Sequence, residues 1–186
     1  MATAVRWFRR VGLVAVLAVA GCTGKPGAVA TPTPSLPLSV PSFTAASPAA
    51  PTDQAVAAYL NLLHAFVAAS NSGGTDTREM AKYATGEALG RLAKGLADNK
   101  AQGVKTQGQP GISTPRVVKI DPSASPMKVD LTGCVDDTHW LVYKDNGQLL
   151  NNTPGGPRPT VAEVTKIGGI WWVTQLAIHG VGTCTG

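Results

Sequence analysis

Residues 127–135 read MKVDLTGCV, and their alternation of apolar and polar side chains decides the fold class. Successive side chains of a β-strand point to opposite faces, so a period of two predicts a strand with one face in the core and the other towards solvent. We therefore predict a half-buried, central strand here. Its apolar positions are Met127, Val129, Leu131 and Val135.

Further stretches with strand character lie on both sides of residues 127–135, from Val104 to the C-terminus. The sequence Asp-Asn-Gly at 145–147 predicts a tight hairpin turn, because Asn and Gly adopt positive φ at little cost. The additional strands that we predict are 116–120, 139–144, 160–167 and 170–178.

Before Val104 the spacing of apolar residues is that of a helix. Apolar side chains three and four positions apart predict an amphipathic helix that begins with Thr52 as its N-cap and ends within 70–74. Asp76 and Glu79 have the spacing of a capping box and predict a shorter second helix. A third helix is expected from about Thr85. The apolar stripe of the first helix consists of Val56, Tyr59, Leu60, Leu63, Phe66 and Val67.

This order of elements, helices first and antiparallel strands after them, indicates an α+β fold in which the helices pack on one face of the sheet. A chain of 186 residues suits one modest domain with tails and excludes a multidomain protein.

The N-terminus has the features of an export signal. Arg6, Arg9 and Arg10 precede an apolar run at 11–20, which is too short to span the roughly 30 Å hydrocarbon core of a membrane. Residues 17–22, LAVAGC, resemble the bacterial lipoprotein signal, in which the chain is cut before a Cys that carries diacylglycerol and often a further acyl chain such as palmitate. The resemblance implies a signal peptide at 1–21 and lipid on Cys22. The alternatives are a secreted protein with an incidental Cys22 and a cytosolic protein with an apolar start.

Residues 22–52 are expected to form a disordered tether rich in Pro, Thr, Ser and Ala, with the folded domain at 53–186. The segment has no period that would bury one face, and too few large apolar side chains to compensate the loss of chain entropy. About thirty such residues reach roughly 90 Å when extended and roughly 30 Å as a flexible coil. The prolines are Pro26, Pro32, Pro34, Pro37, Pro41, Pro48 and Pro51.

The charge of the mature chain argues against a nucleic-acid partner. The full sequence has 16 Lys and Arg and 11 Asp and Glu, but 3 of the basic residues precede the expected cleavage point, which leaves 13 against 11. A net charge of about +2 is too small to bind a phosphate backbone.

Cys134 and Cys184 are the two thiols that remain once Cys22 is lipidated. An even pair in an exported chain favours a disulfide, which would join the central strand to the C-terminal tail. A metal site is the alternative, although no third ligand has a diagnostic spacing and free thiol pairs are rare outside the cytoplasm. We expect no metal and no cofactor.

The pattern of the folded part is similar to that of small secreted lipoproteins of high-GC Gram-positive bacteria. The resemblance implies their cone-shaped nuclear transport factor 2-like fold, with the helices packed on a curved antiparallel sheet. A second Trp in the last strand departs from the family pattern. The matching positions are Cys134-Val135-Asp136, Trp140, Gly147, Gly169-Ile170-Trp171-Trp172-Val173 and Cys184.

An enzyme of this fold needs an acid and a base that face into the cone. Tyr59 lies on the apolar stripe of the first helix, where a core role is expected. His64 lies at the edge of that stripe and is expected at the surface, and Asp130 alternates with apolar strand residues and is expected towards solvent. We therefore expect no catalytic site.

Two further groups of residues are candidate sites. Asp136 and Asp137 could be paired carboxylates, or metal ligands together with His139, but strand alternation sends adjacent side chains to opposite faces. Trp171 and Trp172 predict one indole in the core or lining the cavity and one on a contact surface. With Tyr59, these two are our candidate ligand-binding residues.

These features together predict a lipid-anchored protein at the extracytoplasmic face of the cell membrane that acts as a non-catalytic binding or accessory module. The alternatives are an isomerase-like or cyclase-like enzyme that uses the cone cavity and a purely structural spacer. The expected partners are the membrane, through lipid on Cys22, and a cell-wall component or a surface protein.

We predict that Cys22→Ser releases the protein from membranes or leaves it unprocessed, because the thiol is the expected point of lipid attachment. Membrane fractionation and intact-mass measurement of both proteins test this. A variant with unchanged mass and unchanged membrane association would contradict the prediction.

Overall fold

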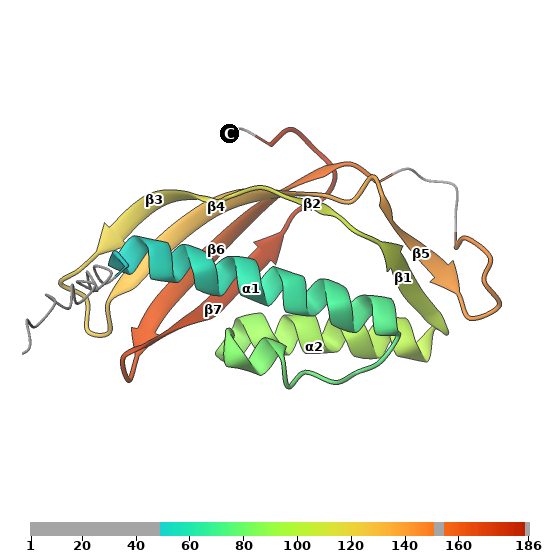
Figure 1. Cartoon of the computed structure of the whole chain (residues 1–186), viewed down its shortest axis with the longest axis horizontal. Coiled ribbons are helices and arrows are strands. Elements are labelled where there is room, and N and C mark those ends of the chain that lie inside the picture. Colours follow the sequence, from blue (N-terminus) through green and yellow to red (C-terminus); the bar gives the residue numbers. More distant parts are fainter. Residues whose placement is uncertain (1–48, 151–154, 185–186) are drawn as a thin grey trace, which may run out of the picture. The chain divides into compact units, whose positions relative to one another are not determined.

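The structure is a computed structural model that describes residues 49–150 and 155–184. The expected signal peptide, Cys22 and the tether up to residue 48 lie outside this range. The described part contains two α-helices, one short 3-10 helix and seven strands (Figure 1). None of its helices has the length and hydropathy needed to cross a membrane.

Helix α1 (Pro51–Ser72) begins two residues earlier than a helix capped by Thr52 would. Its N-cap is Ala50, and Pro51 occupies the first helical turn. Proline suits this position for two reasons. Its fixed φ is helical, and an N–H group at this position would have no hydrogen-bond partner within the helix, so the lack of one in proline costs nothing. The predicted cap is therefore wrong. Gly73 ends the helix in the left-handed conformation, with φ of 66°.

The segment after α1 does not contain the second α-helix that Asp76 and Glu79 predicted. It contains a single 3-10 turn, η1 (Met80–Lys82). Asp76 instead accepts a hydrogen bond from the backbone N–H of Arg78, at 3.0 Å, and pairs with its guanidinium at 2.6 Å. An Asp that closes a turn on the residue two positions ahead competes with helix formation.

Helix α2 (Gly86–Ala101) follows Thr85 as predicted. Leu92 and Leu96 are buried and Leu89 is partly buried against the core, so this helix packs through the side that carries its leucines. Its opposite faces carry exposed ion pairs between Arg91 and Glu87 and between Lys94 and Asp98.

The strands form two antiparallel sheets. The larger has the order β2–β4–β6–β7, with β3 also paired to β4, and the smaller consists of β1 and β5. The sequence had not assigned β1 or β2 as separate strands. The bounds are β1 (Val104–Gly108), β2 (Gly111–Ile112), β3 (Arg116–Asp121), β4 (Lys128–Asp136), β5 (Trp140–Lys144), β6 (Pro157–Ile167) and β7 (Ile170–Ile178).

Strand β4 lies inside the larger sheet, and it is the stretch whose alternation predicted the fold class. Val129, Leu131 and Val135 are buried, whereas Lys128 and Asp130 are only half-buried and point to the other face. The buried side chains meet those of α1 and α2, which lie on the concave side of the curved sheet (Figure 1). This arrangement confirms the α+β fold with helices on a curved antiparallel sheet.

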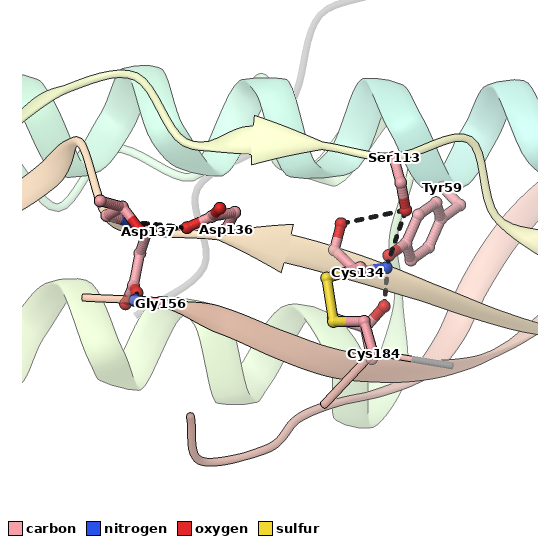
Figure 2. Close-up of a disulfide and its surroundings, with 9 residues drawn as sticks. Tyr59, Ser113, Cys134, Asp136, Asp137, Gly156 and Cys184 are labelled. Atoms are coloured by element: carbon pink, nitrogen blue, oxygen red, sulfur yellow. Dashed lines mark hydrogen bonds between the residues drawn. A yellow bond between two sulfur atoms is a disulfide. The ribbon is translucent and has the colours of Figure 1, made fainter. Parts of the chain in front are cut away.

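A disulfide joins Cys134 of β4 to Cys184 in the C-terminal tail, as predicted (Figure 2). Cys134 points to the convex face, because its neighbours Gly133 and Val135 point to the helices. The tail also follows the end of β6: the N–H of His179 donates to the carbonyl of Pro159, and that of Gly182 to the carbonyl of Pro157.

We predict that the double variant Cys134→Ala/Cys184→Ala lowers the free energy of unfolding by roughly 2–4 kcal/mol, because the cross-link restricts a 50-residue loop in the unfolded chain. Urea denaturation of the variant and of wild type, with and without reductant, measures this. Reduced wild type serves as the control and should match the variant. Equal stability of oxidised and reduced wild type would contradict the prediction.

Candidate functional site

The candidate site is a cavity of about 260 Å³ between the C-terminal half of α1 and the strands. Helix α1 contributes Leu63, Phe66, Val67 and Ser70, which are spaced as one continuous stripe on the helix. The remaining lining residues are Asn99, Thr106, Ile112, Val135, Asp137, Trp140, Arg158 and Ile178.

The cavity wall is mainly apolar because both sheets turn apolar side chains towards α1. Val135 of β4 is buried, and Ile112 of β2 is partly buried against the core. The rings of Phe66 and Trp140 meet edge to face, with centroids 5.9 Å apart. Such an aromatic pair holds its two rings in fixed orientations and provides a flat apolar surface.

Asn71 fixes the smaller sheet to the end of α1. Its side-chain oxygen accepts hydrogen bonds from the hydroxyl of Thr106, at 2.7 Å, and from the indole N–H of Trp140, at 2.9 Å. Its amide nitrogen donates to the carbonyl of Gly108 at 2.9 Å. Because these bonds occupy the polar atoms of Thr106 and Trp140, both residues present chiefly apolar surface to the cavity.

An ion pair between Asp137 and Arg158 forms the charged part of the lining. One carboxylate oxygen accepts from the guanidinium at 2.5 Å, and the other accepts from the backbone N–H of Gly156 at 2.6 Å. The side chain of Asp137 is 16% exposed, and that of Arg158 is 33% exposed. Figure 2 shows Asp137 turned towards Gly156 and away from its neighbour Asp136. The pair is neutral as a unit.

Ser70 is the one described lining residue that is both fully buried and without a hydrogen-bond partner. It is 1% exposed, and its hydroxyl oxygen contacts no donor or acceptor. Buried hydroxyl groups are normally paired, since an unpaired one costs about 1–3 kcal/mol.

The residues considered as an acid–base set do not come together at this cavity. Tyr59 is in the core, where its hydroxyl lies 2.6 Å from that of Thr160, and burial raises its pKa. His64 is exposed on α1, as expected, and Asp130 is half-buried on the convex side of β4. None of the three lines the cavity.

The two adjacent aspartates have different environments. Asp136 is exposed at the end of β4, and its hydrogen bonds from the hydroxyl and backbone N–H of Thr138 lower its pKa. Asp137 follows the strand and turns inward to Arg158. His139 is exposed, and no group of three or more possible metal ligands occurs within residues 49–150 and 155–184.

The adjacent tryptophans lie on opposite faces of β7, as strand alternation predicts. Trp171 is 5% exposed and packs in the core, with the amine of Lys166 5.8 Å from its ring centroid. Trp172 is half-buried on the convex face, opposite Thr165 of β6. Neither indole lines this cavity, and neither does Tyr59. The core positions of Tyr59 and Trp171 agree with the core roles that the sequence predicted for them.

Sequence reasoning missed Ser70, Asn71 and Arg158. Ser70 does have a local signal, because it follows Leu63 by seven residues and so continues the apolar stripe. Because the helix was expected to end within 70–74, Ser70 was not included in the stripe. Arg158 has no local signal, since its partner Asp137 lies 21 residues away in sequence.

We predict that Asp137→Asn lowers the free energy of unfolding by about 1–3 kcal/mol, because it leaves the half-buried Arg158 without a countercharge. Asp136→Asn is the matched control and should change stability by no more than about 0.5 kcal/mol, because its side chain is exposed. Urea denaturation at neutral pH measures both variants. An equal loss in the two would contradict the assignment of Asp137 to the cavity wall.

No protein-family model and no curated protein sequence matches the chain. Two solved structures are similar in backbone. A protein of Novosphingobium aromaticivorans that is named as an aromatic ring hydroxylase has a TM-score of 0.50 and 11% identity, and the match covers 73% of this chain and 94% of that one. The intermembrane-space region of the chloroplast protein ARC6 has a TM-score of 0.46 and 16% identity, over 67% of this chain and 96% of that one.

At 11% identity the similarity to the N. aromaticivorans structure informs on the fold alone. The N. aromaticivorans structure has the nuclear transport factor 2-like fold, and it shares with this chain the helices packed on a curved antiparallel sheet. The described domain of this chain has the nuclear transport factor 2-like fold.

Proposed function

We propose that this protein is a lipid-anchored binding module at the extracytoplasmic face of the cell membrane, and that its cavity holds a small apolar molecule. The lipoprotein-like sequence at 17–22 and the Pro-rich segment after it support the anchored location. The disulfide between Cys134 and Cys184 is typical of a protein that folds outside the reducing cytoplasm.

The observation that carries the binding function is the apolar cavity of about 260 Å³ behind α1. Small-molecule sites are usually concave, mostly apolar and largely preformed, with a few polar groups that orient the ligand. An apolar cavity of this kind holds water poorly and gains free energy when apolar surface fills it. Its wall here combines aliphatic side chains of the sheet with the Phe66–Trp140 pair.

The composition of the wall favours binding over catalysis. Asp137 is the only carboxylate among the described lining residues, and both of its oxygens already accept hydrogen bonds. General acid–base catalysis needs a proton donor or acceptor that can reach the substrate. The enzyme alternative therefore has no specific observation in its favour.

We expect toluene, as a minimal apolar probe, to bind the full chain and to shift the methyl resonances of Leu63 and Val67. Ile112→Trp should weaken this binding several-fold, because the larger side chain occupies part of the cavity. NMR titration of both proteins measures the dissociation constants.

Ile120→Trp is the matched control for this substitution. Ile120 is 46% exposed and does not line the cavity, so its variant should bind toluene like wild type. If toluene shifts no resonance of the lining residues in wild type, the proposed binding function is wrong.

A further inference from the structure

We propose that the hairpin of β6 and β7 is a second membrane contact of this protein, and that its end inserts into the headgroup region of an anionic bilayer. The contact surface, which we call the hairpin tip, consists of Ile167, Gly168, Gly169 and Ile170. The inference rests on the proposed anchored location and adds which end of the domain faces the membrane.

The hairpin tip is an exposed turn without a polar side chain. Strand β6 ends at Ile167 and β7 begins at Ile170, and the two residues are directly paired. Ile167 is 45% exposed and Ile170 is 56% exposed. Exposed turns usually carry polar residues, as the turn at 145–147 does with Asp145 and Asn146. A single exposed isoleucine needs no explanation, whereas two paired ones form a continuous apolar end.

The two glycines give the tip a fixed shape and keep it clear of the rest of the domain. Their φ angles are 59° at Gly168 and 86° at Gly169, as the tightest hairpin turns require and as glycine adopts without strain. A Cβ atom added at either position would meet no atom beyond its chain neighbours within 4 Å. The tip therefore projects from the described domain, and a flat surface such as a bilayer can reach it.

The residues that flank the tip are of the types favoured at the interface between membrane and water. Trp172 is half-buried and lies on the same face of β7 as Ile170, because it is two residues further along the strand. Tryptophan concentrates at this interface, where its ring is in apolar surroundings and its N–H meets the headgroups. Lys166 precedes the tip and belongs to none of the ion pairs within residues 49–150 and 155–184. Anionic headgroups attract such a lysine.

Helix α1 begins at the same end of the sheet as the hairpin tip (Figure 1). The C-terminal half of α1 lines the cavity together with Arg158, near the start of β6, and Ile178, at the end of β7. Tyr59, earlier in α1, contacts Thr160. Pro51 therefore lies towards the other end of these strands, where β6 turns into β7. The expected lipid-bearing tether joins the domain at this point, so the anchor is attached at the end that carries the tip.

A small apolar contact is sufficient for a domain that is already tethered. As a flexible coil, about thirty residues keep the domain within roughly 30 Å of the bilayer. The tether makes the second contact intramolecular, and its effective concentration is then high. A stable protein interface, in contrast, buries roughly 800 Å² on each partner, of which two isoleucines and one half-buried tryptophan supply only a part. The tip therefore fits a membrane better than a protein partner.

The experiment uses the mature lipidated protein, reconstituted into vesicles of phosphatidylcholine and phosphatidylglycerol. The vesicles contain lipids with brominated acyl chains, which quench the fluorescence of a tryptophan that reaches them. We expect the wild-type protein to be quenched. Trp172→Phe should lose most of the quenching, because Trp172 lies beside the tip on its exposed face, whereas Trp171 is buried.

Ile170→Asp should lose at least half of the wild-type quenching and still float with the vesicles, because the lipid continues to anchor it. Ile167→Asp repeats this test at the paired position. Val181→Asp is the matched control: Val181 is 55% exposed and lies in the C-terminal tail, where its neighbour Gly182 bonds to Pro157 at the start of β6. It introduces the same charge at the opposite end of β6 and should be quenched like wild type. Thermal melting checks that each variant is folded.

The outcomes separate this inference from the location on which it rests. If wild type floats with the vesicles without quenching, or if both aspartate variants are quenched like wild type, the tip does not contact the membrane and the inference is wrong, while the anchored location stands. If wild type does not float, the anchored location is wrong, and the inference fails with it. If sedimentation shows a wild-type dimer that Ile170→Asp converts to a monomer, a second copy of the chain covers the tip, which also overturns the inference.

Discussion

The contact between Tyr59 of α1 and Gly133 at the centre of the sheet is the constraint on which the rest of the structure depends. A Cβ atom at Gly133 would come within 2.9 Å of the Tyr59 hydroxyl oxygen. A residue with a side chain at this position would therefore force the buried Tyr59 side chain to shift. The buried hydroxyl is paired with Thr160 of β6, so the contact fixes both the distance and the position of α1 along the sheet.

This contact determines where the cavity lies. The first turns of α1 bury Ala55, Tyr59 and Leu62 against the core. Further along the helix, the smaller sheet of β1 and β5 faces α1 together with the larger one, and Asn71 bridges to the smaller sheet by hydrogen bonds. The same apolar stripe therefore packs the core at one end of α1 and lines the cavity at the other.

The disulfide supports the same region from the opposite side of the sheet, whereas the Asp137–Arg158 ion pair lies in the cavity wall itself. Cys134 is adjacent in sequence to Val135, which lines the cavity, and it is paired across the ladder with Pro159, next to Arg158. The cross-link thus holds the C-terminal tail against the strands that carry Val135 and Arg158. Such a bond persists in an oxidising environment.

Local patterns in the sequence were enough to predict the fold class, the buried face of β4 and the disulfide between Cys134 and Cys184. These features depend on period and on composition, which are local properties of the chain. The sequence also placed Trp171 and Trp172 on opposite faces of their strand. The start of α1 was misjudged because Thr52 is a good cap in isolation, whereas Pro51 suits the first helical turn still better.

Only the tertiary structure decided the site. Whether Ser70 has a partner depends on which side chains face it from other elements, and the pairing of Asp137 with Arg158 depends on how the chain returns to β6. Tyr59 and Trp171 were reasonable candidates by residue type, yet the packing of α1 and β7 places both in the core. Periodicity predicts which face of a helix or strand a side chain lies on. Whether a cavity lies beside that face depends on the elements that pack against it, and these are distant in sequence.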